Sequence, residues 1–440
     1  MLAVLPGDPA PLKASSAQSP AEAAAEFLRR LPDGSTLLVA VSGGSDSTGL
    51  LVMLADYAAR SFPTISIIAA TVDHGLRPEA AAEARSVARL CAQLGVPHAT
   101  LAWQGEKPKT GVQANARRAR YRLLADHAAE KGADLVVTAH TLDDQQETLA
   151  MRRARSDGPP IGISEAVLFE GRLWVCRPLL RVRREAIRAE LAQRGITWTD
   201  DPSNENEAFE RVRVRRDLET TRLPVLQAQC RAPLAREAAR FLQSSARVHG
   251  WQVAEIELPQ AELSPARHFA ILYLAAVIGG RSHVAGREVR EKLRLLLETG
   301  EPFRFTAERV LFDRRKNRLY LSREERNLPH VGIPSGGQAV WDSRFRICNE
   351  RDEAVTVVPA AHAGDAVHLL ETALPDTLPR SIRARMERIA PALRGRSAEG
   401  LLVEPVLAPF AEFLPIDLAE LADALAIRFG MAHFPKLPSR

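Results

Sequence analysis

The chain has 440 residues, enough for two or three domains that each bury a core. Hydrophobic residues make up 46% and charged residues 26%, as in an ordinary soluble globular protein, and the longest apolar run (Phe269 to Gly280, 12 residues) is too short to span a bilayer. The net charge of +5 and the pI of about 9.2 fit a polyanionic partner, although many enzymes without such a partner share these values.

Cysteine spacing and the N-terminal residues exclude further classes of protein. The chain has four cysteines that lie far apart without a C-x-x-C pair: Cys91, Cys176, Cys230 and Cys348. This spacing disfavours a disulfide framework and a zinc site, and it fits a reducing cytosol. No cationic segment precedes the short apolar stretch Met1–Leu5, so a signal peptide is not predicted. We therefore expect a cytoplasmic protein whose residues 1–20, with four prolines, form a flexible leader.

Strand and helix patterns alternate from about residue 21 to residue 200. Strands are expected at Thr36–Val41, Ser66–Val72, His98–Trp103, Leu135–Ala139 and Leu173–Cys176. Helices are expected at Thr48–Ala59, Glu79–Leu94, Val112–Lys131 and Asp144–Arg155. This alternation predicts βαβ units and a doubly wound parallel sheet, an α/β domain that we place at residues 21–225.

The pattern changes after Asp201-Pro202-Ser203-Asn204. Helical periodicity at Ala235–Val248, Pro265–Val277 and Glu288–Glu298 predicts a small, mainly helical domain over 226–328. Alternating residues over Phe303–Leu321 predict a hairpin, and the prolines and glycines within 330–345 predict a linker. The remaining residues, 329–440, are expected to form a mixed α/β C-terminal domain.

A glycine- and serine-rich turn follows the first predicted strand. It consists of Ser42, Gly43, Gly44, Ser45, Asp46 and Ser47. Glycines let backbone N–H groups approach an anion, a helix start adds the positive end of its dipole, and hydroxyl groups add donors. The turn therefore suits phosphate or pyrophosphate, the alternative being a turn without a ligand. It has neither the Gly-Lys-Ser/Thr of a Walker loop nor the G-x-G-x-x-G of a dinucleotide fold.

These six residues resemble the PP-loop of the N-type ATP pyrophosphatases, which bind ATP, adenylate a substrate and release pyrophosphate. The resemblance implies that the loop serines and glycines contact the phosphates of ATP. It also implies that Asp46 holds Mg²⁺ or the nucleotide and offsets charge at the α-phosphate.

A second group of polar residues follows the strand predicted at Leu135–Ala139. His140 ends that strand, and Asp144 and Glu147, three residues apart, share one face of the helix that comes next. Carboxylates in a first helical turn are also common as caps, and that alternative stays open for Asp143. Beside a phosphate loop, two carboxylates suit an ammonium group or a magnesium ion.

The string A-H-x-x-D-D-Q-x-E-T over Ala139–Thr148 resembles the tRNA(Ile)-lysidine synthetase family. Further blocks agree with that family over roughly 25–225: Val72–Arg77, Gln113–Tyr121, Arg177–Leu180, Asp201–Asn204 and Arg211–Arg215. The chain departs from the family at Thr71 and Asp73, where His and Asn are usual. It departs again at Ser156–Ile163, which replaces a Gly-Ser-Gly-rich stretch.

The resemblance implies a reaction and its participants. ATP adenylates O2 of the wobble cytidine in an isoleucine tRNA with a CAU anticodon, and the amine of L-lysine then attacks C2, forming lysidine and releasing AMP. Asp144 and Glu147 would hold the α-amino end of lysine. Arg117 and Arg120 would steady phosphates or the cytidine. His140 is our candidate base.

Several residues keep two interpretations. His74 is either an ATP contact or a structural histidine. Arg211, Arg213 and Arg215 either contact substrate and tRNA phosphates or form a solvated face. For a second basic set, a solvated face is favoured over contact with tRNA: Arg380, Arg383, Arg385 and Arg388. For Trp103 and Trp198 core packing is favoured over base stacking.

Three other functions compete with lysidine synthesis. A PP-loop tRNA thiolase would need a cysteine pair or an iron–sulfur site, which the scattered cysteines disfavour, although Cys176 lies beside a strand end. A small-molecule synthetase that uses ammonia would leave the Arg-rich C-terminal half without a purpose. A catalytically inactive binding module is disfavoured by the intact acidic residues. We expect no membrane association and no obligate protein partner, and a homodimer is compatible with the sequence.

Overall fold

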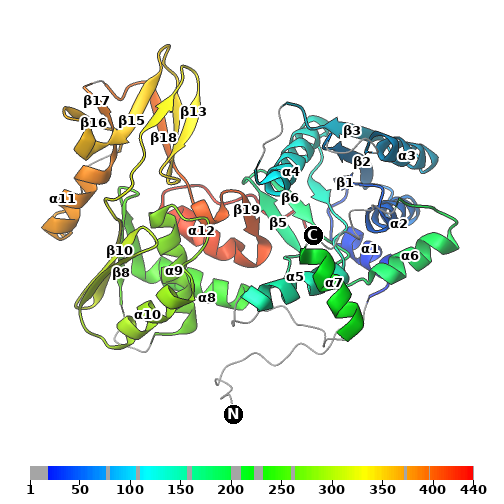
Figure 1. Cartoon of the computed structure of the whole chain (residues 1–440), viewed down its shortest axis with the longest axis horizontal. Helices are drawn as coiled ribbons and strands as arrows, with labels where there is room; N and C mark the ends of the chain where they lie inside the picture. The colour runs from blue at the N-terminus through cyan, green and yellow to red at the C-terminus, as the bar shows by residue number, and fades with distance from the viewer. Residues whose placement is uncertain are drawn as a thin grey trace. The chain divides into compact units, whose positions relative to one another are not determined.

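The computed structural model describes residues 18–75, 80–105, 110–155, 161–199, 210–221, 231–258, 263–370, 374–395 and 397–439. The chain divides into two compact units, which Figure 1 shows in the colours of the sequence. Unit 1 comprises residues 1–167, 172–229 and 436–440, and unit 2 comprises 168–171 and 230–435. Most of the expected leader lies outside the described residues, and Pro20 begins the first helix.

Unit 1 alternates helices and strands along the chain. Its elements are α1 (Pro20–Arg29), β1 (Thr36–Ala40), α2 (Ser45–Ser61), β2 (Ser66–Asp73), α3 (Ala80–Gln93), β3 (His98–Ala102), α4 (Val112–Lys131), β4 (Leu135–Val137), α5 (Leu142–Arg155), β5 (Ala166–Phe169), β6 (Leu173–Cys176), α6 (Arg184–Gln193) and α7 (Glu210–Thr221). Strand β5 begins in unit 1, and its last two residues belong to unit 2.

A parallel sheet forms the centre of unit 1. Strand β1 pairs with β2 on one side and with β4 on the other, and Val39 lies opposite both Ala69 and Val137. Strands β2 and β3 pair in parallel, as do β4 and β6. The order β6-β4-β1-β2-β3 reverses direction between β1 and β4, which confirms the doubly wound α/β fold. Ligands in such sheets bind beyond the carboxyl ends of the strands at this reversal.

Helices cover the apolar strands of this sheet. Helix α2 packs on β1 and β2 and is flanked by α1 and α6, while α4 contacts the four strands from β1 to β4. Leu37, Leu38 and Val39 of β1 are completely buried, as expected for a parallel strand covered on both faces. Helix α1, which packs on α2, begins with a capping box between Ser19 and Glu22 that stabilises its first turn.

The predicted strands and helices of unit 1 are confirmed, with ends that differ by a few residues; α4 and β6 have the predicted bounds. Helices α1 and α6 and strand β5 had not been predicted. The Arg/Val run at 211–215 lies in the helix α7. The Asp201–Asn204 block lies outside the described residues, as do Leu76, Arg77 and most of the Ser156–Ile163 stretch.

The main segment of unit 2, residues 230–435, begins and ends with a helix, and its strands are short. Its elements are α8 (Ala232–Ser245), β7 (Ala246–His249), β8 (Val253–Glu257), α9 (Pro265–Gly279), α10 (Arg287–Glu298), β9 (Phe303–Ala307), β10 (Val310–Arg315), β11 (Arg318–Arg323), β12 (Val331–Ile333), β13 (Gln338–Trp341), β14 (Phe345–Asn349), β15 (Val355–Pro359), η2 (Ala360–His362), β16 (Ala366–His368), α11 (Arg380–Ile389), β17 (Pro391–Arg394), β18 (Leu401–Pro405), η3 (Ala408–Phe410), β19 (Phe413–Pro415), η4 (Ile416–Leu418) and α12 (Ala419–Arg428).

Three helices and an antiparallel sheet make up the first part of unit 2. The strands of this sheet follow the order β7-β8-β11-β10-β9, and α8 packs against both α9 and α12. The predicted hairpin is confirmed, because β10 and β11 pair in antiparallel register from Val310–Arg323 to Arg315–Arg318. Strands β7 and β8 join the sheet on the β11 side of that hairpin. They had not been predicted, because the periodicity of this region indicated helices.

The linker predicted over 330–345 is wrong. Residues in this range form β12 and β13, and Pro334, Gly336 and Gly337 make the turn between them. Gly336 has a φ of 63°, and the N–H of Gly337 donates to the carbonyl of Pro334 at 3.1 Å. Because β12 has three residues and β13 has four, the turn residues between them resembled a linker in the sequence.

The basic residues of α11 have acidic neighbours. Arg388 contacts Glu325 at 2.7 Å, and Arg383 contacts Asp376. These ion pairs agree with the solvated face that the sequence favoured. Within the described ranges, none of the helices combines the length and the apolarity that a bilayer crossing requires.

Candidate active site

The loop between β1 and α2 has the geometry of an anion-binding turn. Gly43 has a φ of +89°, a conformation that side chains with a Cβ rarely adopt, and Gly44 is the N-cap of α2 without a side-chain cap. The hydroxyl of Ser47 donates to the carbonyl of Gly44 at 3.1 Å and lies 3.1 Å from the backbone nitrogen of Ser42. The first turn of a 17-residue helix thus faces the end of β1, as a phosphate site requires.

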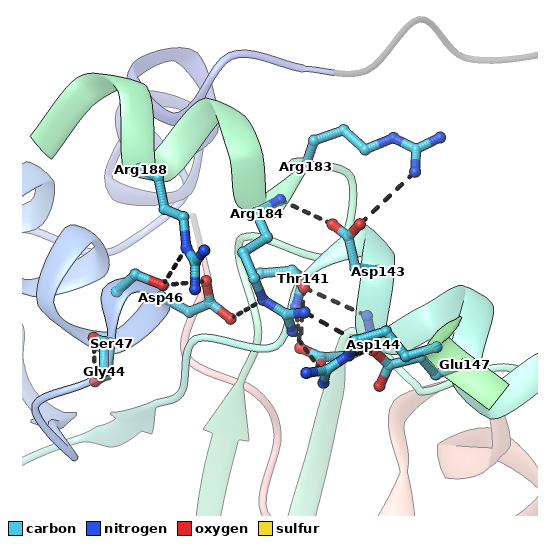
Figure 2. A network of polar contacts seen from close by, with 12 residues as sticks. Gly44, Asp46, Ser47, Thr141, Asp143, Asp144, Glu147, Arg183, Arg184 and Arg188 are labelled. Atoms are coloured by element: carbon cyan, nitrogen blue, oxygen red, sulfur yellow. Dashed lines mark hydrogen bonds and ion pairs between the residues drawn. The ribbon is translucent and has the colours of Figure 1, made fainter. Parts of the chain in front are cut away.

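Arg184, at the first position of α6, connects this loop to α5. Its Nε donates to Oδ2 of Asp46 at 2.9 Å, and its Nη2 donates to Oδ1 of Asp144 at 3.1 Å. Its Nη1 lies 3.8 Å from Oε1 of Glu147. Figure 2 shows the guanidinium of Arg184 pointing between the loop carboxylate and the α5 pair. One planar cation with several donors therefore holds the acidic residues at the starts of α2 and α5 in a fixed relation.

Asp144 both caps α5 and binds cations. Its Oδ2 accepts hydrogen bonds from the N–H of Thr141 at 2.7 Å and from the Thr141 hydroxyl at 3.0 Å, while the N–H of Asp144 donates to that hydroxyl at 3.3 Å. This reciprocal arrangement is a capping box. Oδ1 faces Arg184 and Arg211. Burial acts to raise the pKa of Asp144, but Arg211, Arg184 and the Thr141 N–H together lower it below its ordinary value.

Glu147 is the most enclosed acid of the site. Its side chain is 2% exposed, and Nε of Arg215 donates to its Oε1 at 2.6 Å. Arg211 donates to its other oxygen. Arg211 and Arg215 are four residues apart on α7 and share a face, whereas Arg213 lies on another face of this helix. The structure therefore brings two of the three predicted α7 arginines to the acidic pair.

Two further contacts fix the start of α6 over the loop. The Arg184 N–H donates to Oδ2 of Asp143 at 2.8 Å, so Asp143 acts as a capping group, although for α6 rather than for its own helix. Nε of Arg188, one turn later, lies 3.3 Å from the Ser45 hydroxyl. Burial raises the pKa of Asp46, and the charge of Arg184 opposes that effect.

His140 lies beside three arginines. Burial, then the positive charge of Arg177, lower its pKa to about 3, with Arg117 and Arg120 contributing in the same direction. The Nδ1 atom of His140 lies 3.1 Å from the Thr138 hydroxyl. The imidazole is therefore neutral near pH 7 and has little affinity for a proton, so it is better suited to hydrogen bonding than to proton removal.

The two predicted arginines of α4 occupy different environments. Arg117 is exposed, with its guanidinium 5.0 Å from the ring centre of Tyr121, and burial lowers the pKa of Arg120. His74, after β2, lies edge-on to Trp103 with ring centres 6.1 Å apart. His74 is thus placed near the end of β3, and both interpretations, ATP contact and structural histidine, stay open for it.

Sequence reasoning missed Arg184, together with the neighbouring Arg183 and Arg188. The spacing of four residues between Arg184 and Arg188, shortly after the Arg177–Leu180 block, was the available signal. It went unrecognised because α6 had not been predicted.

A magnesium ion fits this site only beside phosphate oxygens. Among the described residues, no group of three or more His, Cys, Asp and Glu side chains is arranged to hold a metal ion. Asp46 offers one carboxylate on the loop, and Mg²⁺ commonly uses one or two carboxylates together with substrate phosphates and water. The donor set is therefore compatible with magnesium delivered with a nucleotide and not with a magnesium site made of protein alone.

Comparison with known proteins agrees with this geometry. The PP-loop domain family matches residues 17–221. The tRNA(Ile)-lysidine synthase of Rhizobium meliloti (strain 1021) is 42% identical over 95% of this chain and 96% of its own length. The enzyme of the same name from Mesorhizobium japonicum is 37% identical over 91% of this chain and 94% of its own. A solved U34-tRNA thiolase from Methanococcus maripaludis shares 15% identity, with a TM-score of 0.39, over 46% of this chain and 73% of its own.

Proposed function

The chain belongs to the tRNA(Ile)-lysidine synthase family, and from that premise we propose that it ligates lysine to C2 of the wobble cytidine in the CAU anticodon of isoleucine tRNA. ATP first adenylates O2 of that cytidine with release of pyrophosphate. The lysine amine then attacks C2, and the C2–O2 bond breaks as AMP leaves. The observation that supports this function most directly is the contact of one guanidinium, that of Arg184, with both Asp46 and Asp144.

In this proposal the loop after β1 holds the phosphates of ATP. Ser42, Gly43, Gly44 and Ser47 line the open first turn of α2, and Ser45 adds a hydroxyl beside Arg188. Asp46 supplies a carboxylate to magnesium, which would offset charge on the phosphates. Arg184 holds that carboxylate toward α5, so that the positions of the two substrates are linked.

Lysine binding competes with α7 in this proposal. The acidic pair Asp144 and Glu147 binds the α-ammonium of lysine, and Arg211 and Arg215 already satisfy this pair in the described structure. An ammonium group therefore displaces at least one guanidinium, and the released arginine becomes accessible to a substrate phosphate. Arg117 and Arg120 steady the cytidine or its phosphate, and His140 contributes a neutral hydrogen bond.

Pyrophosphate release from ATP tests the reaction. Purified protein is incubated with isoleucine tRNA carrying the CAU anticodon and with each amino acid in turn. We expect turnover with lysine and loss of turnover when the wobble cytidine is replaced by uridine. Turnover that requires a sulfur donor instead would identify a thiolase, and the absence of turnover with either would leave only nucleotide binding.

Asp144→Ala tests the acidic pair. We expect lysine-dependent turnover to be abolished while the affinity for tRNA stays near that of the wild type. Asp56→Ala is the matched control, because Asp56 also pairs with arginines but lies on the far part of α2. Unchanged lysine dependence in Asp144→Ala would remove the assignment of this pair.

Other parts of the proposal concern the rest of the chain. We propose a catalytic domain over 21–225 and tRNA binding by the domains at 226–328 and 329–440. A cytoplasmic location and a homodimer belong to the same proposal. Sedimentation of the purified protein with and without tRNA tests the last of these.

A further inference from the structure

A pocket lies along one face of α4 and includes Trp103, which directly follows β3. This pocket, of about 380 Å³, lies between Trp103, at the end of β3, and one stripe of α4. The stripe consists of Asn115, Arg118, Ala119, Arg122, Leu123 and Asp126. These positions are three or four residues apart, so their side chains form one continuous wall.

The chemistry of the pocket matches a nucleotide. Trp103 offers an aromatic face, and Ala119 and Leu123 offer an apolar wall. The Nδ2 of Asn115 donates to the carbonyl of Gly111 at 3.1 Å, so this amide offers a base edge chiefly its oxygen. Arg118 and Arg122, both exposed, add two guanidinium groups of the kind that bind phosphate.

The pocket lining contains two arginines and one acid. Asp126 is the one acid of the lining, and Arg172 contacts its carboxylate at 3.0 Å. Its negative charge is therefore largely offset within the pocket.

Trp103 is held in position by the sheet. Its backbone N–H donates to the carbonyl of Asp73 at 2.9 Å, and its ring meets the ring of His74 edge-on. An aromatic group that is already oriented loses little conformational entropy when a base stacks on it.

The pocket and the candidate active site share α4. Arg117 and Arg120, which act on the pKa of His140, lie on the side of α4 toward the site, whereas Arg118 and Arg122 line the pocket. An α-helix with its side chains is about 10 Å across, which is a short distance for an extended nucleotide strand. Because the two sites lie on different sides of one helix, we expect one RNA strand to place one base in the active site and another nucleotide in the pocket.

We propose that this pocket binds an unpaired nucleotide of the tRNA anticodon loop, next to the nucleotide that reacts. The proposal rests on the proposed function for the identity of the RNA. A free nucleotide such as ATP has the same chemistry, and the measurements below separate the two sources.

The test measures the affinity of the full-length protein for an anticodon stem-loop RNA, without ATP or lysine, by fluorescence anisotropy at several salt concentrations. We expect Trp103→Ala to weaken binding roughly tenfold, within the range known for base–aromatic stacking, and Trp103→Phe to restore most of that loss. The salt dependence should be unchanged in Trp103→Ala, because stacking releases no counterions.

Charge variants complete the test. Arg118→Gln with Arg122→Gln should weaken binding roughly tenfold and lower the slope of log K against log salt by about 0.7 for each phosphate that is no longer neutralised. Arg85→Gln with Arg89→Gln is the matched control, because these arginines are also four residues apart and exposed, on α3. The KM for ATP should stay at the wild-type value in all variants.

Three outcomes would overturn the proposal. They are unchanged RNA affinity in Trp103→Ala, equal losses in the α4 and α3 arginine pairs, and a raised KM for ATP with unchanged RNA affinity. Circular dichroism and the behaviour of Trp103→Phe separate misfolding from the loss of stacking. If the wild type forms no lysidine but the variants still lose affinity for the stem-loop RNA as expected, the proposed reaction is refuted and the RNA pocket is retained.

Discussion

Nε of Arg184 lies 2.9 Å from Oδ2 of Asp46, although the two residues are 138 positions apart in the chain. This contact joins the first residue of α6 to the first turn of α2. The same guanidinium reaches Asp144, so the position of the loop carboxylate depends on the position of α5.

Replacing Arg184 should impair both stability and turnover. Arg184→Ala leaves buried carboxylates without one of their cations, which costs about 3–5 kcal/mol in the free energy of unfolding. Turnover should fall about 100-fold, because the loop carboxylate loses its fixed position. Urea unfolding and steady-state kinetics provide the measurements.

Arg194→Ala is the control for Arg184→Ala. Arg194 follows α6 and pairs with Glu190 and Asp56 near the surface, so its loss should cost less than about 1 kcal/mol. Arg184→Lys should recover part of the stability but little turnover, since an ammonium group cannot contact Asp46 and Asp144 in the same planar arrangement. Equal effects of Arg184→Ala and Arg194→Ala would contradict the role assigned to Arg184.

Gly49 controls how closely α6 approaches α2. A Cβ added at Gly49 would overlap Cγ2 of Ile187, on the helix that carries Arg184. Gly49→Ala should therefore lower the free energy of unfolding by about 1–3 kcal/mol, despite the better helix propensity of alanine. Turnover should fall as well, since α6 is displaced from the loop.

The Ile187→Ala background tests this explanation of Gly49. Removing the opposing methyl group should make the added effect of Gly49→Ala smaller, which a double-mutant cycle by urea unfolding measures. Gly286→Ala serves as the control, because a Cβ there meets no atom within 4 Å. Additive effects of the two substitutions would show that Ile187 is not the cause.

His140 should make the protein less stable in mild acid. Its pKa is lowered to about 3, whereas an unfolded histidine has a pKa near 6.5. Between these values the unfolded chain holds a proton that the folded chain lacks. The free energy of unfolding therefore falls as the pH decreases, by at most about 1.4 kcal/mol per pH unit from this residue.

Thermal or urea unfolding at pH 7, 6 and 5 should show a steeper loss in the wild type than in His140→Asn. The lowered pKa of Asp144 acts in the same direction, but its contribution is lost only below the pKa of an unfolded aspartate, about 3.9. Parallel pH curves for the wild type and His140→Asn would disagree with a neutral, partly buried imidazole.

Cys176 should be dispensable for turnover. Burial raises the pKa of its thiol to about 12 and that of Cys91 to about 11, so neither forms a reactive thiolate near pH 7. Cys176→Ala should keep lysine-dependent turnover within about twofold of the wild type, as expected for an unreactive thiol. Loss of turnover together with a requirement for a sulfur donor would favour the thiolase reaction instead.

Much of unit 1 was predictable because its signals are local. A buried parallel strand is an apolar run, and the turn that follows it carries glycines, as at Gly43 and Gly44. Helices α2 and α4 are long, with 17 and 20 residues, and were predicted. The short α6 was not, because its 10 residues directly follow a turn and give only a short signal.

In unit 2, the same local rules misidentified 330–345. Strands of three and four residues, β12 and β13, contain too few alternating positions to be distinguished from the turn between them. Only their pairing with β15 and β14 makes them strands.

By itself, the sequence determined the doubly wound fold, the PP-loop and the acidic helix start with Asp144 and Glu147, because each depends on residues close together in the chain. The tertiary structure decided which charges meet. It placed Arg184 between Asp46 and Asp144, and it brought α7 to Glu147. Such contacts join strand ends and helix starts distant in sequence, and they follow from the order of strands in the sheet and the packing of α6 on α2.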